Sequence, residues 1–245
     1  MQEKFEILEG AFIVGDAHYS HNRPQFLEFL KAIATKELNP PQLILMGDIF
    51  DALFGDIPYT HKLNQEAIDL INEISLYIEV VYLEGNHDFN LKEIFAFVKV
   101  FPISMQPVLS KMDKRAIFLA HGDIESDLKY RVYTSLIRNS FVLLVLKIID
   151  SLSRHTILKA LDRYLSKKED CREFLGLEAF ILKRLGEKYK CDYFIEGHYH
   201  QNRVFRLRNF TYINLAAFAC NQRYFIVKSK QDIEFLEEKI FSKGM

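Results

Sequence analysis

Apolar and polar positions alternate along the first 125 residues in short blocks that are typical of an α/β fold. Runs of strand length stand at 11–14, 43–46, 78–83 and 115–120, and helical periodicity covers 26–34 and 67–74. Strand and helix patterns that take turns in this way predict a sheet with helices on its faces. Each of these strands is followed by glycine and polar residues. Ligands of open α/β sheets bind at the carboxyl ends of strands, so we expect a site there.

The pattern changes between about residues 126 and 189, where Leu, Ile, Lys and Arg recur at helical spacing. Helices are predicted at 130–149, 153–167 and 171–189, followed by short strands at 193–195, 204–207, 211–215, 224–227 and 233–236. The polar breaks between these last strands indicate antiparallel, hairpin-like pairing. We therefore expect one mixed α/β domain over residues 1–245, with a helical cap inserted at about 126–189.

Composition excludes several classes of protein. The 245 residues are 49% apolar and 13% aromatic with a net charge of −1, the opposite of a disordered chain or a general nucleic-acid coat. Three cysteines without C-x-x-C spacing argue against a disulfide framework or a structural zinc site, and favour a reducing cytoplasm. The N-terminus has no apolar leader, and no run reaches about 18 apolar residues. We therefore expect a cytoplasmic protein without a membrane-spanning helix.

Residues with metal-binding side chains follow five of the predicted strands. The blocks are Asp16-x-His18, Gly47-Asp48-x-x-Asp51, Gly85-Asn86-His87-Asp88, His121-Gly122-Asp123 and Gly197-His198-x-His200. They contain five of the eight histidines, and five of only ten glycines lie in or beside them. Carboxylate, imidazole and amide oxygen are ligands for divalent ions such as Mn²⁺, Fe²⁺ or Zn²⁺. The blocks contain no cysteine, which is a further argument against a structural zinc site.

These five blocks, in this order, resemble the pattern of the calcineurin-like metallophosphoesterases. The resemblance covers residues 11–218 outside the insertion and implies a two-sheet α/β/β/α sandwich with two divalent metal ions. Manganese is our first expectation, with iron or zinc as alternatives. The resemblance implies that Asp16, His18, Asp48 and His200 hold one ion and that Asp48, Asn86, His121 and His198 hold the other. Asp48 would then bridge the two.

The resemblance also implies roles beyond metal binding. Two metal ions clamp the attacking and leaving oxygens of a phosphoryl displacement and supply hydroxide near neutral pH. His87 would face the phosphate, either donating to the leaving oxygen or stabilising developing charge, and Asp88 would orient it. Asp51 is expected to be a turn or supporting residue rather than a ligand. His21, His61 and His155 lie outside the blocks and are expected at the surface or on the substrate side.

Within that family the chain is most similar to the hydrolases that cleave the pyrophosphate of UDP-2,3-diacylglucosamine in lipid A synthesis. The similarity lies in the continuations MGDIFDALFGD and GNHDFNLKEIF, and in Asp127-x-x-Tyr130 ahead of a basic helical insertion. One residue departs from that branch, because His87 stands where those hydrolases usually have arginine. Hydrolysis of nucleotides, cyclic nucleotides or phosphoproteins is therefore an alternative. A non-catalytic interaction protein on this fold is a remote one, because all the expected ligand positions are occupied.

The insertion is strongly basic. Residues 129–168 contain nine Lys and Arg against two Asp, a net charge of +7, so the rest of the chain carries −8. A basic helical segment with apolar runs suits an anionic amphiphile, here a nucleotide sugar with acyl chains, or peripheral contact with the inner membrane surface. Ordinary core packing with a solvated face is the alternative, and a cap over nucleic acid is a weaker one. The residues expected to contact substrate are Asn86, His87, Asp127 and Tyr130 by position and Arg154, Lys159 and Arg163 by charge.

Overall fold

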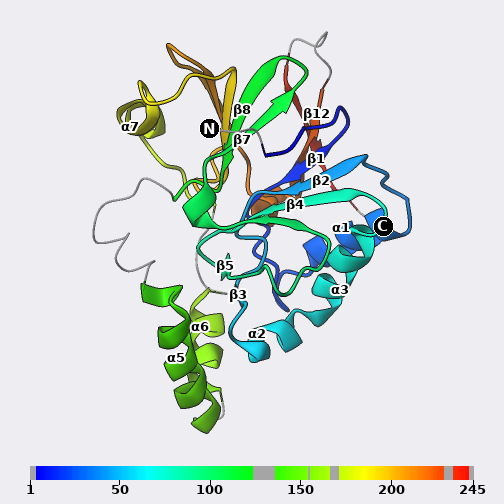
Figure 1. Cartoon of the computed structure of the whole chain (residues 1–245), viewed down its shortest axis with the longest axis vertical. Coiled ribbons are helices and arrows are strands. Elements are labelled where there is room, and N and C mark those ends of the chain that lie inside the picture. Colours follow the sequence, from blue (N-terminus) through cyan, green and yellow to red (C-terminus); the bar gives the residue numbers. More distant parts are fainter. Residues whose placement is uncertain (1–3, 124–135, 154, 166–170, 229–233, 243–245) are drawn as a thin grey trace.

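Two β-sheets lie face to face with helices on their outer surfaces (Figure 1). The structure is a computed structural model that describes residues 4–123, 136–153, 155–165, 171–228 and 234–242. The first sheet has the strand order β13-β12-β1-β2-β4-β6, and the second has the order β10-β11-β9-β8-β7. A short pair, β3 (Leu53–Phe54) with β5 (Asp88–Phe89), lies beside them.

The first sheet is mainly parallel. Its strands are β1 (Phe12–Val14), β2 (Gln42–Leu45), β4 (Glu79–Leu83), β6 (Lys99–Phe101), β12 (Arg223–Val227) and β13 (Leu236–Ile240). Strands β1, β2, β4 and β6 pair in parallel, whereas β12 and β13 add an antiparallel edge. The carboxyl ends of the parallel strands β1, β2 and β4 therefore meet at one edge of the sheet.

The second sheet corrects one expectation. Its strands are β7 (Val108–Met112), β8 (Arg115–Ala120), β9 (Tyr193–Glu196), β10 (Arg203–Arg206) and β11 (Thr211–Asn214). The last strands were expected to pair as antiparallel hairpins, but β9 pairs in parallel with both β8 and β11. Only β10–β11 and β12–β13 are antiparallel among them. A short polar break permits a hairpin but does not require one, because the next strand can insert elsewhere in the sheet.

Alternation along the strands builds three apolar layers. In β1, Phe12 and Val14 face α1 (Gln25–Ala34) and α3 (Gln65–Ile74), whereas Ile13 faces the second sheet. The outer face of the second sheet packs Phe118 and Phe194 against α7 (Leu177–Leu185). Because side chains point alternately to the two faces of a strand, buried residues on both faces place each sheet between two layers. The expected α/β/β/α sandwich is confirmed.

The helices of the insertion do not stay together. Helices α5 (Ser140–Leu152) and α6 (Thr156–Leu165) form a pair that projects from the sandwich beside α2 (Pro58–Leu63), far from α7 (Figure 1). Their contact with the body is a small cluster in which Leu143 and Leu158 meet Ile57 and Phe89. Helix α7 falls within the predicted insertion of 126–189 but covers the second sheet, so it is part of the sandwich and not of the projecting pair.

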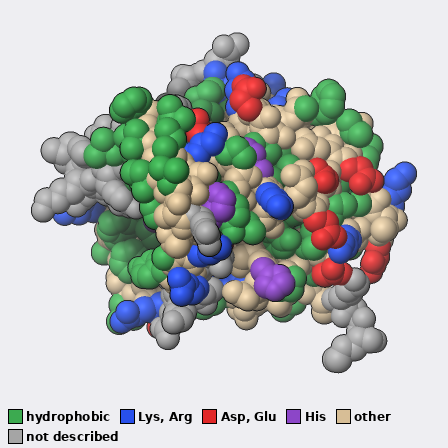
Figure 2. Space-filling view, turned by 90° about the horizontal axis from the view of Figure 1, so that it is seen from below, with side chains coloured by type: hydrophobic (Ala, Val, Ile, Leu, Met, Phe, Trp, Pro, Cys, Tyr) green, Lys and Arg blue, Asp and Glu red, His purple; other side chains and the backbone are tan. Residues whose placement is uncertain are grey.

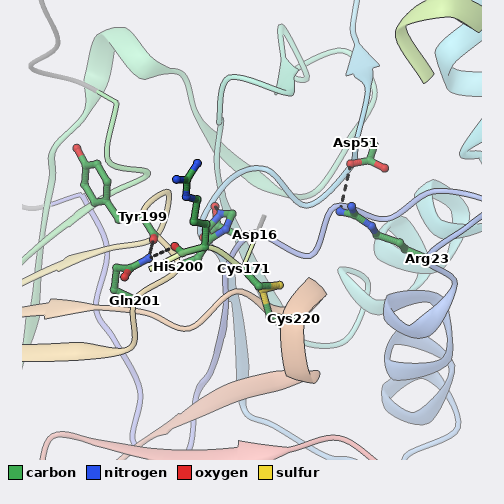
Figure 3. Close-up of a disulfide and its surroundings, with 9 residues drawn as sticks. Asp16, Arg23, Asp51, Cys171, Tyr199, His200, Gln201 and Cys220 are labelled. Carbon is green, nitrogen blue, oxygen red and sulfur yellow. Dashed lines mark hydrogen bonds and ion pairs between the residues drawn. A yellow bond between two sulfur atoms is a disulfide. The ribbon is translucent and has the colours of Figure 1, made fainter. Parts of the chain in front are cut away.

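The cysteines also behave differently from expectation. Cys171 and Cys220 form a disulfide with a Cα–Cα distance of 5.8 Å (Figure 3). Cys220 lies in the short helix α8 (Phe218–Asn221), and Cys191 is free. The expectation failed because it considered only the number and spacing of the cysteines, and the fold brings together two that are 49 residues apart. None of the described helices is long and apolar enough to cross a membrane.

Candidate metal centre

The seven predicted ligands converge where strands of the two sheets end. The ligand atoms of Asp16, His18 and His200 lie within 4.8 Å of one another, as do those of Asp48, His121 and His198. Asn86 joins the second group, because its Oδ1 is 3.2 Å from Nε2 of His121. The groups adjoin, since the His198 amide donates to Asp16 Oδ1 and Oδ2 at 3.0 and 2.9 Å. The fold thus brings the seven residues together in two adjoining groups, with Asp48 in the second.

The backbone is strained at several of the same residues. Five of them adopt positive φ angles between 45° and 60°: Asp16, His18, Asp48, His198 and His200. Non-glycine residues pay for this left-handed conformation, and such strain concentrates at functional sites. Six other described residues, among them Lys36 and Asn90, share this conformation, so the strain agrees with the site but does not locate it by itself.

Two glycines pack directly on ligand carboxylates. A Cβ on Gly197 would lie 2.3 Å from Asp16 Oδ2, and a Cβ on Gly85 would lie 2.2 Å from Asp48 Oδ1. Neither space can hold a methyl group, so the strand ends approach the carboxylates only because these residues lack a side chain.

Charge pairing organises the buried groups. Asp16 Oδ1 lies 3.1 Å from His200 Nε2, and Asp48 Oδ2 lies 3.4 Å from His121 Nε2. Burial alone would raise the pKa of Asp16, but the adjacent His200 outweighs it and lowers that pKa. Burial likewise opposes charge on Asp48 and His121, yet their attraction lowers the pKa of Asp48 and raises the pKa of His121 well beyond their ordinary values. Both carboxylates are therefore ionised near neutral pH.

The histidine rings fit a metal site. His18 is 1% exposed, and its Nε2 makes no hydrogen bond to the described residues. Burial and the charge of His121 lower the pKa of His198 to about 4, so its ring is neutral. A buried imidazole nitrogen without a partner is costly in a folded protein unless it has a ligand. Carboxylates, neutral imidazoles and an amide oxygen form a donor set for divalent ions of the first transition row.

His87 and Asp88 are placed differently from each other. His87 lines the cavity described below, and its Nδ1 lies 2.9 Å from the carbonyl oxygen of Asp51. Asp88 does not orient it, contrary to our expectation. Its carboxylate accepts hydrogen bonds from the Tyr82 hydroxyl and from the amides of Gly85, Asp48, Ile49 and Phe50. Asp88 is wholly buried, and its contacts support the Asp48 loop, not the His87 ring.

Asp51 lies beside a proposed ligand, in keeping with the supporting position expected for it. Its Oδ1 lies 3.3 Å from His18 Nδ1 and 3.9 Å from Arg23 Nη1, the latter contact drawn in Figure 3. Asp51 is thus a charged neighbour of the His18 ring, although neither ring nitrogen makes a hydrogen bond to the described residues. The D-x-x-D spacing from Asp48 was the available signal for this role.

A cavity of about 350 Å³ runs from this centre to the projecting helices. Asp51, Asn86 and His87 line one part of it. Most of the remaining lining is apolar and comes from α5, α6 and the β3–β5 region: Phe54, Ile57, Phe89, Ile137, Leu143, Leu146, Ile157, Leu158, Leu161 and Leu165. Seen from below in Figure 2, hydrophobic side chains gather on this face beside Lys and Arg side chains.

The expected substrate contacts are only partly placed. Asp127, Tyr130 and Arg154 lie outside the described residues. Lys159 and Arg163 are exposed on α6 and are not among the residues that line the cavity, whereas Lys147 is. Arg138, a basic residue of the insertion that the sequence did not indicate as a site residue, donates from Nη2 to the carbonyl of Gly85 at 2.8 Å. Charge alone identified the basic segment but not the side chains that face inward.

Comparison with known proteins shows what the chain is similar to. The family model described as calcineurin-like phosphoesterase matches residues 11–202. The UDP-2,3-diacylglucosamine hydrolase of Psychromonas ingrahamii is 27% identical over 202 residues, covering 77% of this chain and 79% of its own. The enzyme of that name from Haemophilus influenzae is 24% identical over 240 residues, covering 93% and 98%. Among solved structures, the E. coli phosphoesterase Yfce has a TM-score of 0.47 at 12% identity, covering 95% and 99%.

Proposed function

Because the chain belongs to the calcineurin-like phosphoesterase family and is a metal-dependent hydrolase, we propose that it cleaves the pyrophosphate of UDP-2,3-diacylglucosamine. The products would be UMP and 2,3-diacylglucosamine 1-phosphate. Relatives named for this activity cover most of the chain, at 20–27% identity. Their names support the substrate, and the geometry of the cavity is the stronger reason for choosing it.

The single observation that carries the proposal is the continuity between the metal centre and an apolar cavity. Asn86 and His87 line the same cavity as Leu143, Leu158 and Leu161 of the projecting helices. A substrate that fills it must have a phosphate group at one end and apolar chains at the other. A diacylated nucleotide sugar has both, whereas a free nucleotide or a phosphoprotein loop has no acyl group for the α5–α6 side.

The side chains of the centre would divide the work. We propose two manganese ions, one held by Asp16, His18, Asp48 and His200 and one by Asp48, Asn86, His121 and His198. Such ions supply an acidified water and neutralise charge on the phosphoryl oxygens. Because a carbonyl oxygen only accepts, Nδ1 of His87 carries a hydrogen, and Nε2 is the ring atom left to meet the substrate. His87 would there stabilise the leaving phosphate.

The exposed side of α5 supports peripheral contact with a membrane. Large apolar side chains stand in solvent along this helix, among them Phe141 at 73% and Leu152 at 82% exposure. The others are Leu144, Val145, Ile148 and Ile149. A helix with this surface lies stably at a lipid interface. A diacylated substrate would then reach the cavity from the inner membrane surface without crossing water.

The substrate assignment is tested by comparing two reactions. The protein with added Mn²⁺ is incubated with UDP-2,3-diacylglucosamine, and UMP release is compared with hydrolysis of bis-p-nitrophenyl phosphate. We expect far faster turnover of the lipid, and loss of both reactions in Asp48→Ala. Equal turnover of the two would reject the lipid substrate, and activity that survives in Asp48→Ala would reject the metal centre.

A further inference from the structure

A buried ion pair lies behind the second group of ligands. Arg184 on α7 is 7% exposed, and its Nη2 pairs with Oε2 of Glu196, the fully buried last residue of β9. Neither residue lines the cavity or belongs to the proposed metal ligands. Burying two charges is expensive unless each gains good partners, so the further contacts of this pair show what it stabilises.

The arginine also reaches the end of the neighbouring strand. Its Nη1 donates to the carbonyl oxygen of Gly122 at 2.6 Å. The hydroxyl of Tyr199 donates to the same oxygen at 2.9 Å. Gly122 directly follows His121, so these bonds fix the backbone one residue after a proposed ligand. Gly122 also lies close to His198, because a Cβ on Gly122 would be 2.8 Å from Cβ of His198.

The glutamate side of the pair fixes the other strand end. Tyr212 donates to Glu196 Oε2 at 2.9 Å, and Asn214 Nδ2 donates to the Gly197 carbonyl at 2.6 Å. Gly197 immediately precedes His198. One guanidinium therefore connects the chain after β8 to the end of β9. Its partner Gly122 is one residue from His121, and its partner Glu196 is two residues from His198. The ring nitrogens of those histidines, His121 Nε2 and His198 Nδ1, are 3.2 Å apart.

Only the planar fork of arginine can make both bonds at once. Its two terminal nitrogens point to a carboxylate and to a carbonyl on adjacent strands, whereas the ammonium of lysine is a point charge. The rings of Tyr199 and Phe180 hold the guanidinium in place, with centroids 5.4 and 5.7 Å from its carbon. The guanidinium is thus held by two aromatic rings and through both of its terminal nitrogens.

We propose that Arg184 is a positioning residue that sets the spacing of His121 and His198 for the second metal ion. It touches neither the ion nor the substrate and acts through the Gly122 and Glu196 contacts. The inference rests on the metal centre of the proposed function. Through Arg184, the outer helix α7 would raise the affinity of the centre for its second metal ion.

The test is Arg184→Lys, which keeps the charge beside Glu196 and loses the fork. Mn²⁺ binding to the metal-free protein is measured by titration calorimetry, together with thermal unfolding. We expect one of the two ions to bind about 10- to 100-fold more weakly, which is the usual effect of losing a contact that supports a metal ligand. The affinity for the other ion should change by no more than about twofold. Arg115→Lys is the matched control, because Arg115 also stacks over two aromatic rings but stands at the opposite end of β8. It should bind both ions normally.

The outcomes separate the two proposals. If the unsubstituted protein binds no Mn²⁺, the metal centre itself fails. If it binds two ions and Arg184→Lys binds both equally well, only the positioning role is overturned. Should Arg184→Lys not fold, Tyr199→Phe removes the second donor to Gly122 and leaves the ion pair intact. This variant should bind the same ion about fivefold more weakly, as expected for the loss of one neutral hydrogen bond. Undiminished Mn²⁺ binding in Tyr199→Phe would also overturn the positioning role of Arg184.

Discussion

The carboxylate of Asp88 holds the backbone of Asp48. Oδ1 of Asp88 accepts from the Asp48 amide at 3.0 Å, and Oδ2 accepts from the next two amides at 2.6 and 3.2 Å. Asp48 is the proposed bridge between the metal ions and stands in the left-handed conformation. Its strained loop is therefore stabilised by a neighbour two residues beyond Asn86 and not by the metal site alone.

Asp88→Asn should weaken the metal centre without touching it. Asparagine places an NH₂ group, which donates, against backbone amides that also donate, so at least one bond is lost. We expect about 10- to 100-fold weaker Mn²⁺ binding and unfolding easier by about 2 kcal/mol. Metal titration and denaturant unfolding measure both quantities. The exposed Asp69→Asn on α3 is the control, and equal metal affinity in the two variants would contradict the role of Asp88.

Gly197→Ala should slow hydrolysis by crowding Asp16, a proposed metal ligand. The added methyl group would stand 2.3 Å from Asp16 Oδ2, so the carboxylate or the strand end must move. We expect hydrolysis to fall by about 100-fold or more, since misplacement by about 1 Å has that cost. Gly15→Ala is the matched control on the opposing strand, because its nearest contact is an ordinary 3.4 Å to Met46. A Gly197→Ala protein as active as Gly15→Ala would show that the close approach is unnecessary.

Metal binding should release a proton. Burial opposes charge on His121, but Asp48 outweighs it and raises the pKa of His121 well above its usual value, so the metal-free protein carries a proton there at neutral pH. A metal needs that lone pair, so the apparent Mn²⁺ affinity should rise by up to about tenfold per pH unit while the pH is below the raised pKa of His121. The stability of the metal-free protein changes with pH in the opposite direction. The ion pair of His121 with Asp48 stabilises the fold fully below about pH 6.5, and this stabilisation is lost as the pH rises through the raised pKa of His121.

Calorimetry in buffers of different ionisation enthalpy checks the released proton. The observed binding enthalpy should vary linearly with the ionisation enthalpy of the buffer, with a slope that corresponds to about one released proton. An enthalpy independent of the buffer would mean that His121 is neutral before the metal arrives.

Leu161→Trp should discriminate between substrates. Leu161 lines the cavity on α6, and a larger side chain there removes space that the proposed acyl chains occupy. We expect hydrolysis of UDP-2,3-diacylglucosamine to fall by about tenfold or more, because pocket fit is worth at least that much per group. Hydrolysis of bis-p-nitrophenyl phosphate should stay unchanged. Ala160→Trp on the exposed side of the same helix is the control, and parallel losses on both substrates would argue against an acyl cavity.

Reducing the disulfide should lower stability. The bond closes a loop with a sequence separation of 49 residues, for which the chain-entropy account predicts about 4 kcal/mol. Thermal unfolding with and without a dithiol, and of Cys220→Ser, measures the effect. Cys191→Ser should behave like the unsubstituted protein, because Cys191 is free, and burial raises the pKa of its thiol to about 12. Unfolding insensitive to the dithiol would contradict a stabilising bond.

The amino-acid sequence by itself determined the elements and the chemistry of the candidate site. Strand β8 spans Arg115–Ala120, as its apolar run predicts, because side-chain alternation and turn residues act over a few positions. The ligand types after each strand were readable for the same reason, and so was the metallophosphoesterase family. Predicted and observed boundaries of α1 differ by one residue, since Pro24 precedes the helix.

Only the tertiary structure decided which elements meet. It placed β8 and β9 in a second sheet opposite β1, β2 and β4, so that Asp16 and His200 pair across 184 positions of the chain. It joined Cys171 to Cys220, turned Asp88 toward the Asp48 loop, and moved α7 from the cap to the outer layer. Such contacts depend on packing between segments that are distant in the sequence. The apolar pattern of one helix or strand shows which of its faces is buried, but not which other helix or strand will cover that face.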